Sequence, residues 1–285
     1  MDATRSNIRI VTDTTATLEP GFAEQHSIEV VPQIIIFGNE SFREEADLSY
    51  SEFIRRLKAS PQLPKTAAPH LGDMMDAYRR QLAAAPTVLS IHPSSEVSGT
   101  VRSAETAVAE GFPDDDIRII DTRTVAGNLA SMVKAATEWV ESGISADEIV
   151  NRLKAMIPRG RTYFLVATLE NLQKGGRIGG ASALIGSALQ IKPILEIRDG
   201  RVEPLERVRT YNHALERLKQ LVIEQSPRSP DARISVMHAD DLPGAQKLAA
   251  ALKAALEFSD IPICSLGAAI TTHGGPGALG VGFFV

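Results

Sequence analysis

The chain has 285 residues, of which 44% are hydrophobic and 23% are charged, with 21 Gly and 16 Pro. This composition excludes a disordered or collagen-like chain and supplies enough apolar residues for one large core or two medium ones. The formal net charge of −5 excludes a general electrostatic attraction to nucleic acid or to an anionic membrane.

Cysteine content and the chain's start give two further expectations. The single cysteine, Cys264, excludes an internal disulfide and a four-cysteine zinc framework. It lies in an apolar stretch that predicts a buried strand, so we expect a small hydrophobe there rather than a nucleophile. The first seven residues have no apolar signal-peptide core, and no apolar run approaches ~20 residues. We therefore expect a cytoplasmic protein without stable membrane insertion.

Strand and helix patterns alternate over the first half of the chain. Capping boxes at Ser49 with Glu52, and at Ser145 with Glu148, each predict a helix start. We expect strands at 8–11, 30–37, 87–91 and 117–120, and helices at 49–59, 71–84, 98–110, 124–141 and from 145. Such alternation predicts a parallel sheet with helices on both faces.

The pattern changes after Pro158. Asp199 and Gly200 predict the turn of a hairpin between strands at 193–198 and 202–208. We expect further strands at 163–167, 234–237, 263–270 and 279–285, and helices at 179–190, 211–225 and 243–257. The sequence thus predicts two α/β domains, residues 1–158 with a parallel sheet and residues 159–285 with a mixed sheet.

Hydroxyl and acidic residues follow the predicted parallel strands. Asp13 and Thr14 come after the first strand, and the loop 94–100 (SSEVSGT) comes after the third. Because ligands bind beyond the carboxyl ends of parallel strands, these residues are candidates for one binding site. Ser98 and Gly99 lie where a helix N-terminus suits a carboxylate or a phosphate. On sequence alone, simple helix capping by these residues stays open.

Two more segments carry candidate polar groups. Thr66 lies in a proline-bracketed stretch, 64–69, that on its own would be a linker loop. His273 begins a glycine-rich loop, HGGPG, that we expect directly after an apolar strand. For His273, a structural role and a functional role both stay open at this point.

Common catalytic templates are missing from the sequence. There is no ATP-binding GxxxxGK[ST] loop and no GxSxG nucleophile elbow to accompany the His-Gly-Gly run. The glycines at 175–180 miss the dinucleotide-binding spacing, and the six histidines show no short metal-ligand spacing. We therefore expect no cofactor and no metal, and a binding role is favoured over catalysis.

The same segments together resemble the DegV family. The likeness extends over nearly the whole chain, through IVTDTTA, PKT, SSEVSGT, LENLQKGGRI, KPIL, RVRT, HAD and HGGPG, in this order. This resemblance implies a two-domain α/β fold related to the substrate-binding part of dihydroxyacetone kinase. It also implies a non-catalytic subunit that holds one long-chain fatty acid and presents its carboxylate to a separate ATP-dependent kinase, giving an acyl phosphate for phospholipid synthesis.

The resemblance also implies roles for particular residues. Thr66, Ser98 and His273 match the family's carboxylate-binding positions. Arg209 matches an arginine near the ligand head or at the kinase-docking surface. The secondary candidates for head-group contact or partner docking are Arg177, Asp13, Thr14 and Gly99. The family usually has Ser at the positions of Thr14 and Ala67, and commonly Thr at the position of Gly274, so the outer hydrogen bonds differ here.

Alternatives to the carrier hypothesis remain. The main one is a free-standing small-molecule kinase or hydrolase acting on a polar substrate. A transcriptional regulator is disfavoured by the acidic balance and by the lack of a basic helix-turn-helix. For the carrier hypothesis, we expect the acyl tail to lie in an apolar tunnel between the helices of the first domain and its sheet.

Overall fold

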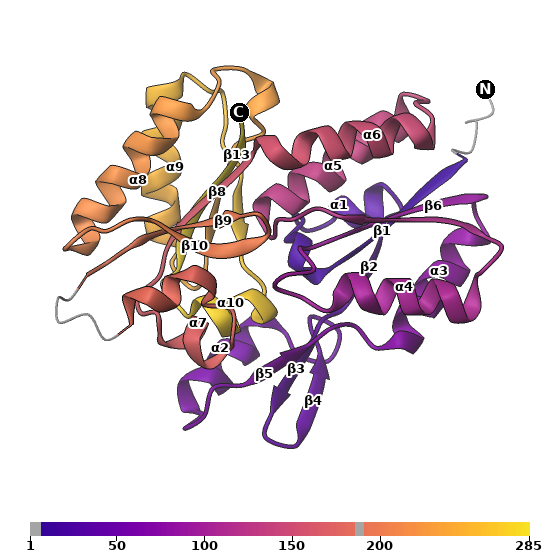
Figure 1. Ribbon diagram of the computed structural model, residues 1–285, viewed down its shortest axis with the longest axis horizontal. Helices are drawn as coiled ribbons and strands as arrows, with labels where there is room; N and C mark the ends of the chain where they lie inside the picture. The colour runs from indigo at the N-terminus through magenta and orange to yellow at the C-terminus, as the bar shows by residue number, and fades with distance from the viewer. Residues whose placement is uncertain (1–6, 186–190) are drawn as a thin grey trace.

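The computed structural model describes residues 7–185 and 191–285, which form two α/β lobes side by side (Figure 1). The described strands make a four-stranded sheet, a six-stranded sheet and a small three-stranded sheet. The predicted fold class, α/β with one parallel and one mixed sheet, is confirmed. The domain boundary at residue 158 stays a prediction.

The N-terminal lobe is built on the parallel sheet. Its strands lie in the order β2 (Glu29–Val31), β1 (Ile8–Asp13), β6 (Thr87–His92) and β7 (Asp116–Asp121). Successive side chains of a strand point to opposite faces. Val11 and Val88 therefore pack on α3 (Leu71–Leu82) and α4 (Thr100–Gly111). Ile10 and Leu89 pack on the other face with α5 (Gly127–Glu141) and α6 (Ala146–Met156). Helices thus cover both faces, as the sequence predicts.

The C-terminal lobe is built on the six-stranded mixed sheet. Its order is β10 (Arg201–Glu206), β9 (Ile194–Arg198), β8 (Gly160–Leu165), β13 (Leu279–Phe284), β11 (Ser235–His238) and β12 (Ile263–Ser265). Only the β11–β12 pair is parallel. Helices α8 (Tyr211–Gln225) and α9 (Leu242–Leu256) cover one face. The predicted hairpin is confirmed, because β9 and β10 pair around Asp199 and Gly200.

The expected strand at 30–37 is wrong, since the chain changes sheet in its middle. Pro32 lacks an N–H donor and separates β2 from β3 (Ile34–Phe37). Strand β3 pairs antiparallel with β4 (Glu40–Arg43) and with β5 (Lys65–Ala67). Thr66, expected in a linker loop, therefore lies in a strand opposite Ile35. This small sheet projects below both lobes in Figure 1, beside α2 (Tyr50–Ala59).

The expected strand at 263–270 is also wrong beyond its first residues. After β12 the chain forms a short helix, α10 (Ala268–Gly274), which packs on the three-stranded sheet through Ala268 and Ala269. His273 thus lies in the last turn of a helix and not in a loop after a strand. Cys264 is buried, as expected, and burial raises the pKa of its thiol to about 11.

The remaining elements are short. They are α1 (Phe22–Gln25), α7 (Glu170–Lys174) and four 3₁₀ turns, η1 (Thr14–Ala16), η2 (Ile157–Arg159), η3 (Gly179–Leu184) and η4 (Pro230–Ala232). The helix expected at 179–190 is a 3₁₀ turn over its first six residues, and 186–190 lie outside the described residues. Within the described part of the chain, every helix is too short or too polar to cross a membrane.

Candidate functional site

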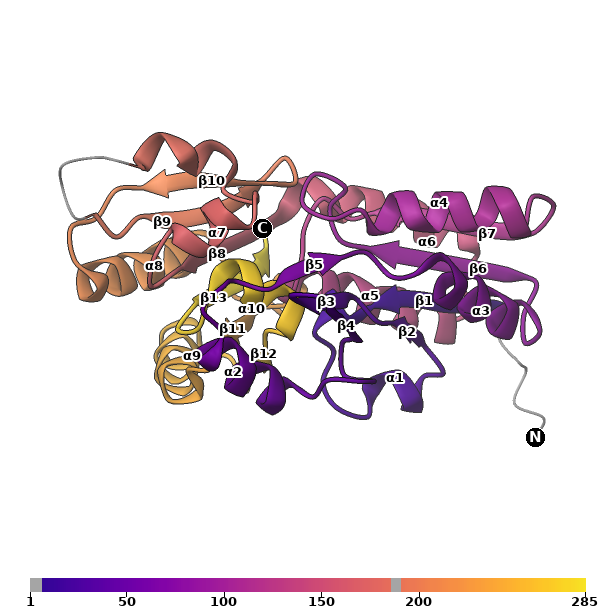
Figure 2. The same cartoon turned by 90° about the horizontal axis from the view of Figure 1, so that it is seen from below.

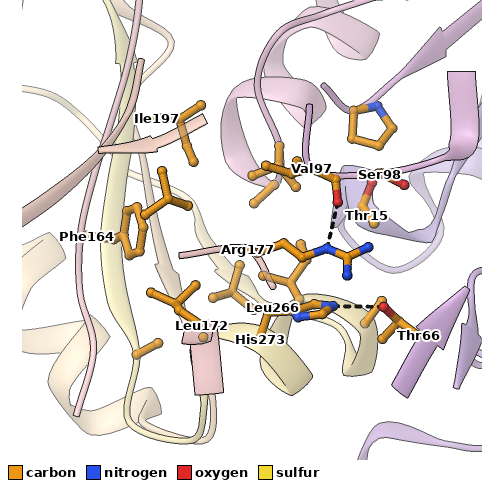
Figure 3. A pocket seen from close by; sticks show the side chains of 18 of the residues that line it. Thr15, Thr66, Val97, Ser98, Phe164, Leu172, Arg177, Ile197, Leu266 and His273 are labelled. Atoms are coloured by element: carbon orange, nitrogen blue, oxygen red, sulfur yellow. Dashed lines mark hydrogen bonds between the residues drawn. The ribbon is translucent and has the colours of Figure 1, made fainter. Parts of the chain in front are cut away.

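An apolar pocket lies between the two lobes. It encloses about 1010 Å³ of space free of protein atoms, part of it open to solvent. Its apolar wall comes from the mixed sheet, where Phe164 and Ile197 point toward it, and from Leu172 of α7 (Figure 3). Its polar wall comes from the N-terminal lobe, β5 and α10. The pocket thus lies against the mixed sheet, not between the helices of the N-terminal lobe and its own sheet, where we expected the tail.

Thr66 and His273 meet at the polar end of the pocket. Thr66 Oγ1 lies 2.8 Å from His273 Nε2, although 207 positions separate the two residues. Burial, and secondarily the nearby Arg177, lowers the pKa of His273 to about 4. The imidazole is therefore neutral at pH 7, and one of its two ring nitrogens carries a proton. Nδ1 is buried and has no hydrogen-bond partner among the described residues.

Ser98 and Gly99 line the same pocket from the loop between β6 and α4. Helix α4 begins at Thr100 with Gly99 as its N-cap, so this loop lies at a helix N-terminus as predicted. Ser98 Oγ accepts from the backbone N–H of Thr100 at 3.3 Å and lies 2.8 Å from Thr100 Oγ1. Because the N-terminus of a helix is electropositive, this loop favours an anion.

Arg177 supplies the positive charge of the site. Its Nε donates to the carbonyl of Val97 at 3.0 Å and its Nη1 donates to the carbonyl of Gly175 at 2.7 Å. Figure 3 shows its guanidinium between Ser98 above and the Thr66–His273 pair below. Among the described lining residues, Arg177 is the only permanently charged side chain, and no carboxylate lines the pocket. The lining therefore carries a net positive charge.

A buried carboxyl group holds α10 in place. Glu44 is 1% exposed; it accepts from the backbone N–H of Ala269 at 2.9 Å and from the hydroxyl of Thr14. Burial raises the pKa of Glu44 to about 7, because its hydrogen bonds offset only part of the desolvation cost. The first turn of the helix that carries His273 is thus tied to the N-terminal lobe.

Comparisons with known proteins agree on one family. A family model described as an uncharacterised protein of the DegV family matches residues 7–285. A DegV domain-containing protein of Halalkalibacterium halodurans is 36% identical over 283 residues, which cover 98% of this chain and 99% of that protein. Protein DegV of Bacillus subtilis is 35% identical over 277 residues, covering 96% and 98%. The chain belongs to the DegV family.

Solved DegV structures share this fold over their full length. A DegV family protein from Thermus thermophilus, described for its fatty acid binding, superposes with a TM-score of 0.86 at 30% identity, covering 98% of this chain and 99% of that one. DegV of Bacillus subtilis, described as a fatty acid binding protein, gives a TM-score of 0.88 at 33% identity, covering 98% and 100%.

The other candidate residues of this DegV-family protein lie outside the pocket wall. Asp13 is completely buried behind it, and Thr14 is engaged by Glu44 and by the backbone N–H of Gln33. Arg209 is exposed on the segment between β10 and α8 and does not line the pocket. The structure therefore brings Thr66, Ser98, Gly99, Arg177 and His273 together and leaves Arg209 apart.

Several residues that line the pocket are not among those predicted from the sequence. Gln33 and Thr15 belong to its polar wall. Gln33 is the one polar residue in the apolar run 30–37, and a polar side chain in a buried run needs a partner, so a signal was present. The apolar wall from the mixed sheet gave no such signal, because alternating apolar residues of a strand look alike whether they line a core or a pocket.

Proposed function

We propose that this protein binds one long-chain fatty acid in the pocket between its lobes, as a cytoplasmic, non-catalytic subunit. The carboxylate of the bound acid accepts hydrogen bonds from Thr66, Ser98 and His273 and faces the guanidinium of Arg177. The observation that carries this proposal is the charge and polarity of the lining: hydroxyls, a neutral imidazole and one cation at one end, and apolar side chains over the rest. Related DegV structures, described as fatty acid binding, support it.

The neutral state of His273 matters for this assignment. A buried carboxylate requires donors and a counter-charge, because an unpaired buried charge costs several kcal/mol. Arg177 supplies the charge, and His273 supplies a neutral donor at Nε2 once the carboxylate replaces Thr66 as its partner. With His273 uncharged at pH 7, the site holds one cation for one anion.

The acyl phosphate step belongs to a separate ATP-dependent kinase in this proposal. The sequence has no ATP-binding GxxxxGK[ST] loop, so another protein holds the ATP. The bound carboxylate attacks the γ-phosphorus, the bond from that phosphorus to the β–γ bridging oxygen breaks, and ADP leaves. Arg177, beside the carboxylate, and Arg209, on the surface, are the candidates for partner docking or for neutralising the transferring phosphoryl group.

Lipid extraction and titration test the binding proposal. An organic extract of the purified protein should contain fatty acid at about one mole per mole of protein. After delipidation, a 16-carbon acid should bind at least about 100-fold more tightly than an 8-carbon acid, because each buried CH₂ contributes about 0.8 kcal/mol before ordering costs. Equal affinities for the two acids would contradict the proposal.

Hydroxylamine trapping tests the partner. The protein incubated with ATP, Mg²⁺ and the 16-carbon acid should form no acyl hydroxamate unless a fatty acid kinase is added. With the kinase, a triple variant Thr66→Val, Ser98→Ala, His273→Ala should support much less product, since each lost donor costs about 1–3 kcal/mol. Product formed by this chain alone would favour the free-standing enzyme instead.

A further inference from the structure

A line of buried polar side chains reaches the pocket from inside the N-terminal lobe. Asp13, Gln33 and Thr100 are 0%, 3% and 0% exposed. They come from β1, from the β2–β3 connection and from the start of α4, so the fold alone brings them together. The line ends at Ser98, which lines the pocket.

Asp13 fixes which way the Gln33 amide points. Its Oδ1 accepts from Gln33 Nε2 at 3.0 Å and from the backbone N–H of Thr15 at 3.0 Å, and its Oδ2 lies 2.8 Å from His92 Nδ1. Since a carboxylate can only accept, the Gln33 atom facing it must be the amide nitrogen and not the amide oxygen.

Gln33 in turn fixes the direction of the Thr100 hydroxyl. The second N–H of the amide donates to Thr100 Oγ1 at 2.8 Å. Among the described residues, Thr100 Oγ1 has one other side-chain hydrogen-bond partner, Ser98 Oγ, at 2.8 Å. With Gln33 donating from one side, Thr100 turns its own proton toward Ser98.

Within the part of the chain that the structure describes, Ser98 keeps one hydrogen-bonding group without a partner. The contact between the two hydroxyls is 2.8 Å long, and the backbone N–H of Thr100 donates to Ser98 Oγ at 3.3 Å. With the Thr100 proton turned toward Ser98, the Ser98 oxygen accepts in both contacts. A hydroxyl has two lone pairs and one proton. Both lone pairs are then occupied, and the proton points to whatever occupies the pocket.

We propose that Gln33 is a positioning residue that, through Thr100, makes Ser98 a dedicated hydrogen-bond donor and so selects an acceptor-only head group. The proposal rests on the proposed function, because the head group it selects is the carboxylate of the bound acid. A matched alcohol has a proton of its own and adapts to either direction of the Ser98 hydroxyl. Gln33 therefore contributes to the preference for acid over alcohol, and not to the affinity for the tail.

Gln33 can orient the Thr100 hydroxyl because its own backbone is held in place by hydrogen bonds. The Gln33 N–H donates to Thr14 Oγ1 at 3.1 Å, and its carbonyl accepts from the N–H of Glu44 at 2.8 Å. The side chain therefore starts from a fixed point where the chain passes from the parallel sheet to the three-stranded sheet.

The test compares a 16-carbon fatty acid with the 16-carbon primary alcohol on delipidated full-length protein. Gln33→Met keeps the side-chain length and removes both donors. It should lower the ratio of acid to alcohol affinity about 5- to 10-fold, the value of one net hydrogen bond. Thr100→Val, which breaks the line at its second member, should lower the ratio by a similar factor.

Two control variants separate positioning from general damage. Thr100→Ser keeps the hydroxyl and should restore the wild-type ratio. Thr106→Val removes a hydroxyl elsewhere on α4, where it donates to the Arg102 carbonyl, and should leave the ratio unchanged. An unchanged ratio in Gln33→Met, or an equal loss of acid and alcohol affinity, would overturn the proposal. A wild-type protein that binds neither ligand would instead contradict the proposed function itself.

Discussion

Gly175 faces the ring of His273 so closely that no larger residue fits. A Cβ at this position would lie 2.1 Å from His273 Nδ1. The backbone of Gly175 has a φ of −78°, which any residue can adopt. A larger residue at this position is therefore opposed by contact with His273 and not by backbone strain. We expect Gly175→Ala to push the imidazole away from Thr66 and from the carboxylate to which Nε2 donates in the proposed complex. The affinity for a 16-carbon acid should fall at least about 5-fold, the value of one lost hydrogen bond, as measured by titration.

Gly176→Ala is the matched control for this prediction. Gly176 has a φ of +73° and nothing within 4 Å of its Cβ position. Alanine there should cost about 1–2 kcal/mol of stability through left-handed backbone strain, without moving His273. If Gly175→Ala binds the acid like the wild type, the position of the His273 ring is unimportant for binding. If Gly176→Ala loses as much affinity as Gly175→Ala, the loss does not come from the His273 ring.

Individual site residues could be predicted from sequence to different degrees. Ser98 and Gly99 follow a strand and precede a helix, and this local pattern correctly predicts a helix N-terminus. Thr66 and His273 gave only weak local signals, because their contact joins residues 207 positions apart. Their identification depended on the family resemblance, and their role in carboxylate binding stays a proposal.

At the scale of elements, Glu44, which holds the first turn of α10, makes the stability of the fold depend on pH. The pKa of its carboxyl rises from 4.5 to about 7 on folding, so between these values the folded state binds more protons than the unfolded state. Stability from this group is therefore lost as pH rises through that range. Glu44→Gln stays uncharged, so its unfolding free energy relative to wild type should rise by about 2.5 kcal/mol between pH 5 and pH 8.

Urea unfolding at several pH values measures this difference. The control is Glu110→Gln, which removes an exposed carboxylate from α4 and should follow the wild-type profile. If Glu44→Gln instead loses stability relative to wild type as pH rises, the carboxylate is the favoured form, and the desolvation argument for Glu44 fails.

Elements defined by local chemistry were the ones predicted correctly. Ser49 and Ser145 cap α2 and α6 by accepting from the N–H three residues on, as their capping boxes predict. Strand β5 was missed because its pairing with β3 is formed between distant segments. Helix α10 was missed because Ile270, Thr271 and Thr272 favour extended structure, and contacts with Glu44 and the three-stranded sheet override that preference.

At the scale of the whole molecule, the two lobes meet at the rim of the pocket. Glu96 of the N-terminal lobe pairs with Arg201 at 2.6 Å, and Arg123 donates to the carbonyl of Asp199. Asp199 lies in the turn of the β9–β10 hairpin and Arg201 directly follows that turn. Ile197 and Val202 of the same hairpin line the pocket. Because exposed ion pairs contribute little stability, the contact between the lobes depends more on the close packing of the turn. Figure 2 shows β9 and β10 reaching toward the loop before α4.

Gly200, in this turn, tests whether lobe contact shapes the pocket. It has a φ of +81°, and a Cβ there would lie 2.2 Å from the Oγ of buried Ser94 and 3.0 Å from the guanidinium carbon of Arg123. Alanine should therefore strain the turn and also push the hairpin off the N-terminal lobe. We expect both stability and affinity for the 16-carbon acid to fall.

Gly38 allows the two effects to be separated. It occupies the two-residue turn between β3 and β4 with a φ of +61°, but nothing lies within 4 Å of its Cβ position. Gly38→Ala should cost about 1–2 kcal/mol from backbone strain and leave the acid affinity unchanged. Gly200→Ala should cost more and should also weaken binding, because Ile197 and Val202 move with the turn. Urea unfolding measures the stability of both variants, and titration with the 16-carbon fatty acid measures their affinity. Equal stability losses with unchanged affinity in both variants would show that the pocket does not depend on contact between the lobes.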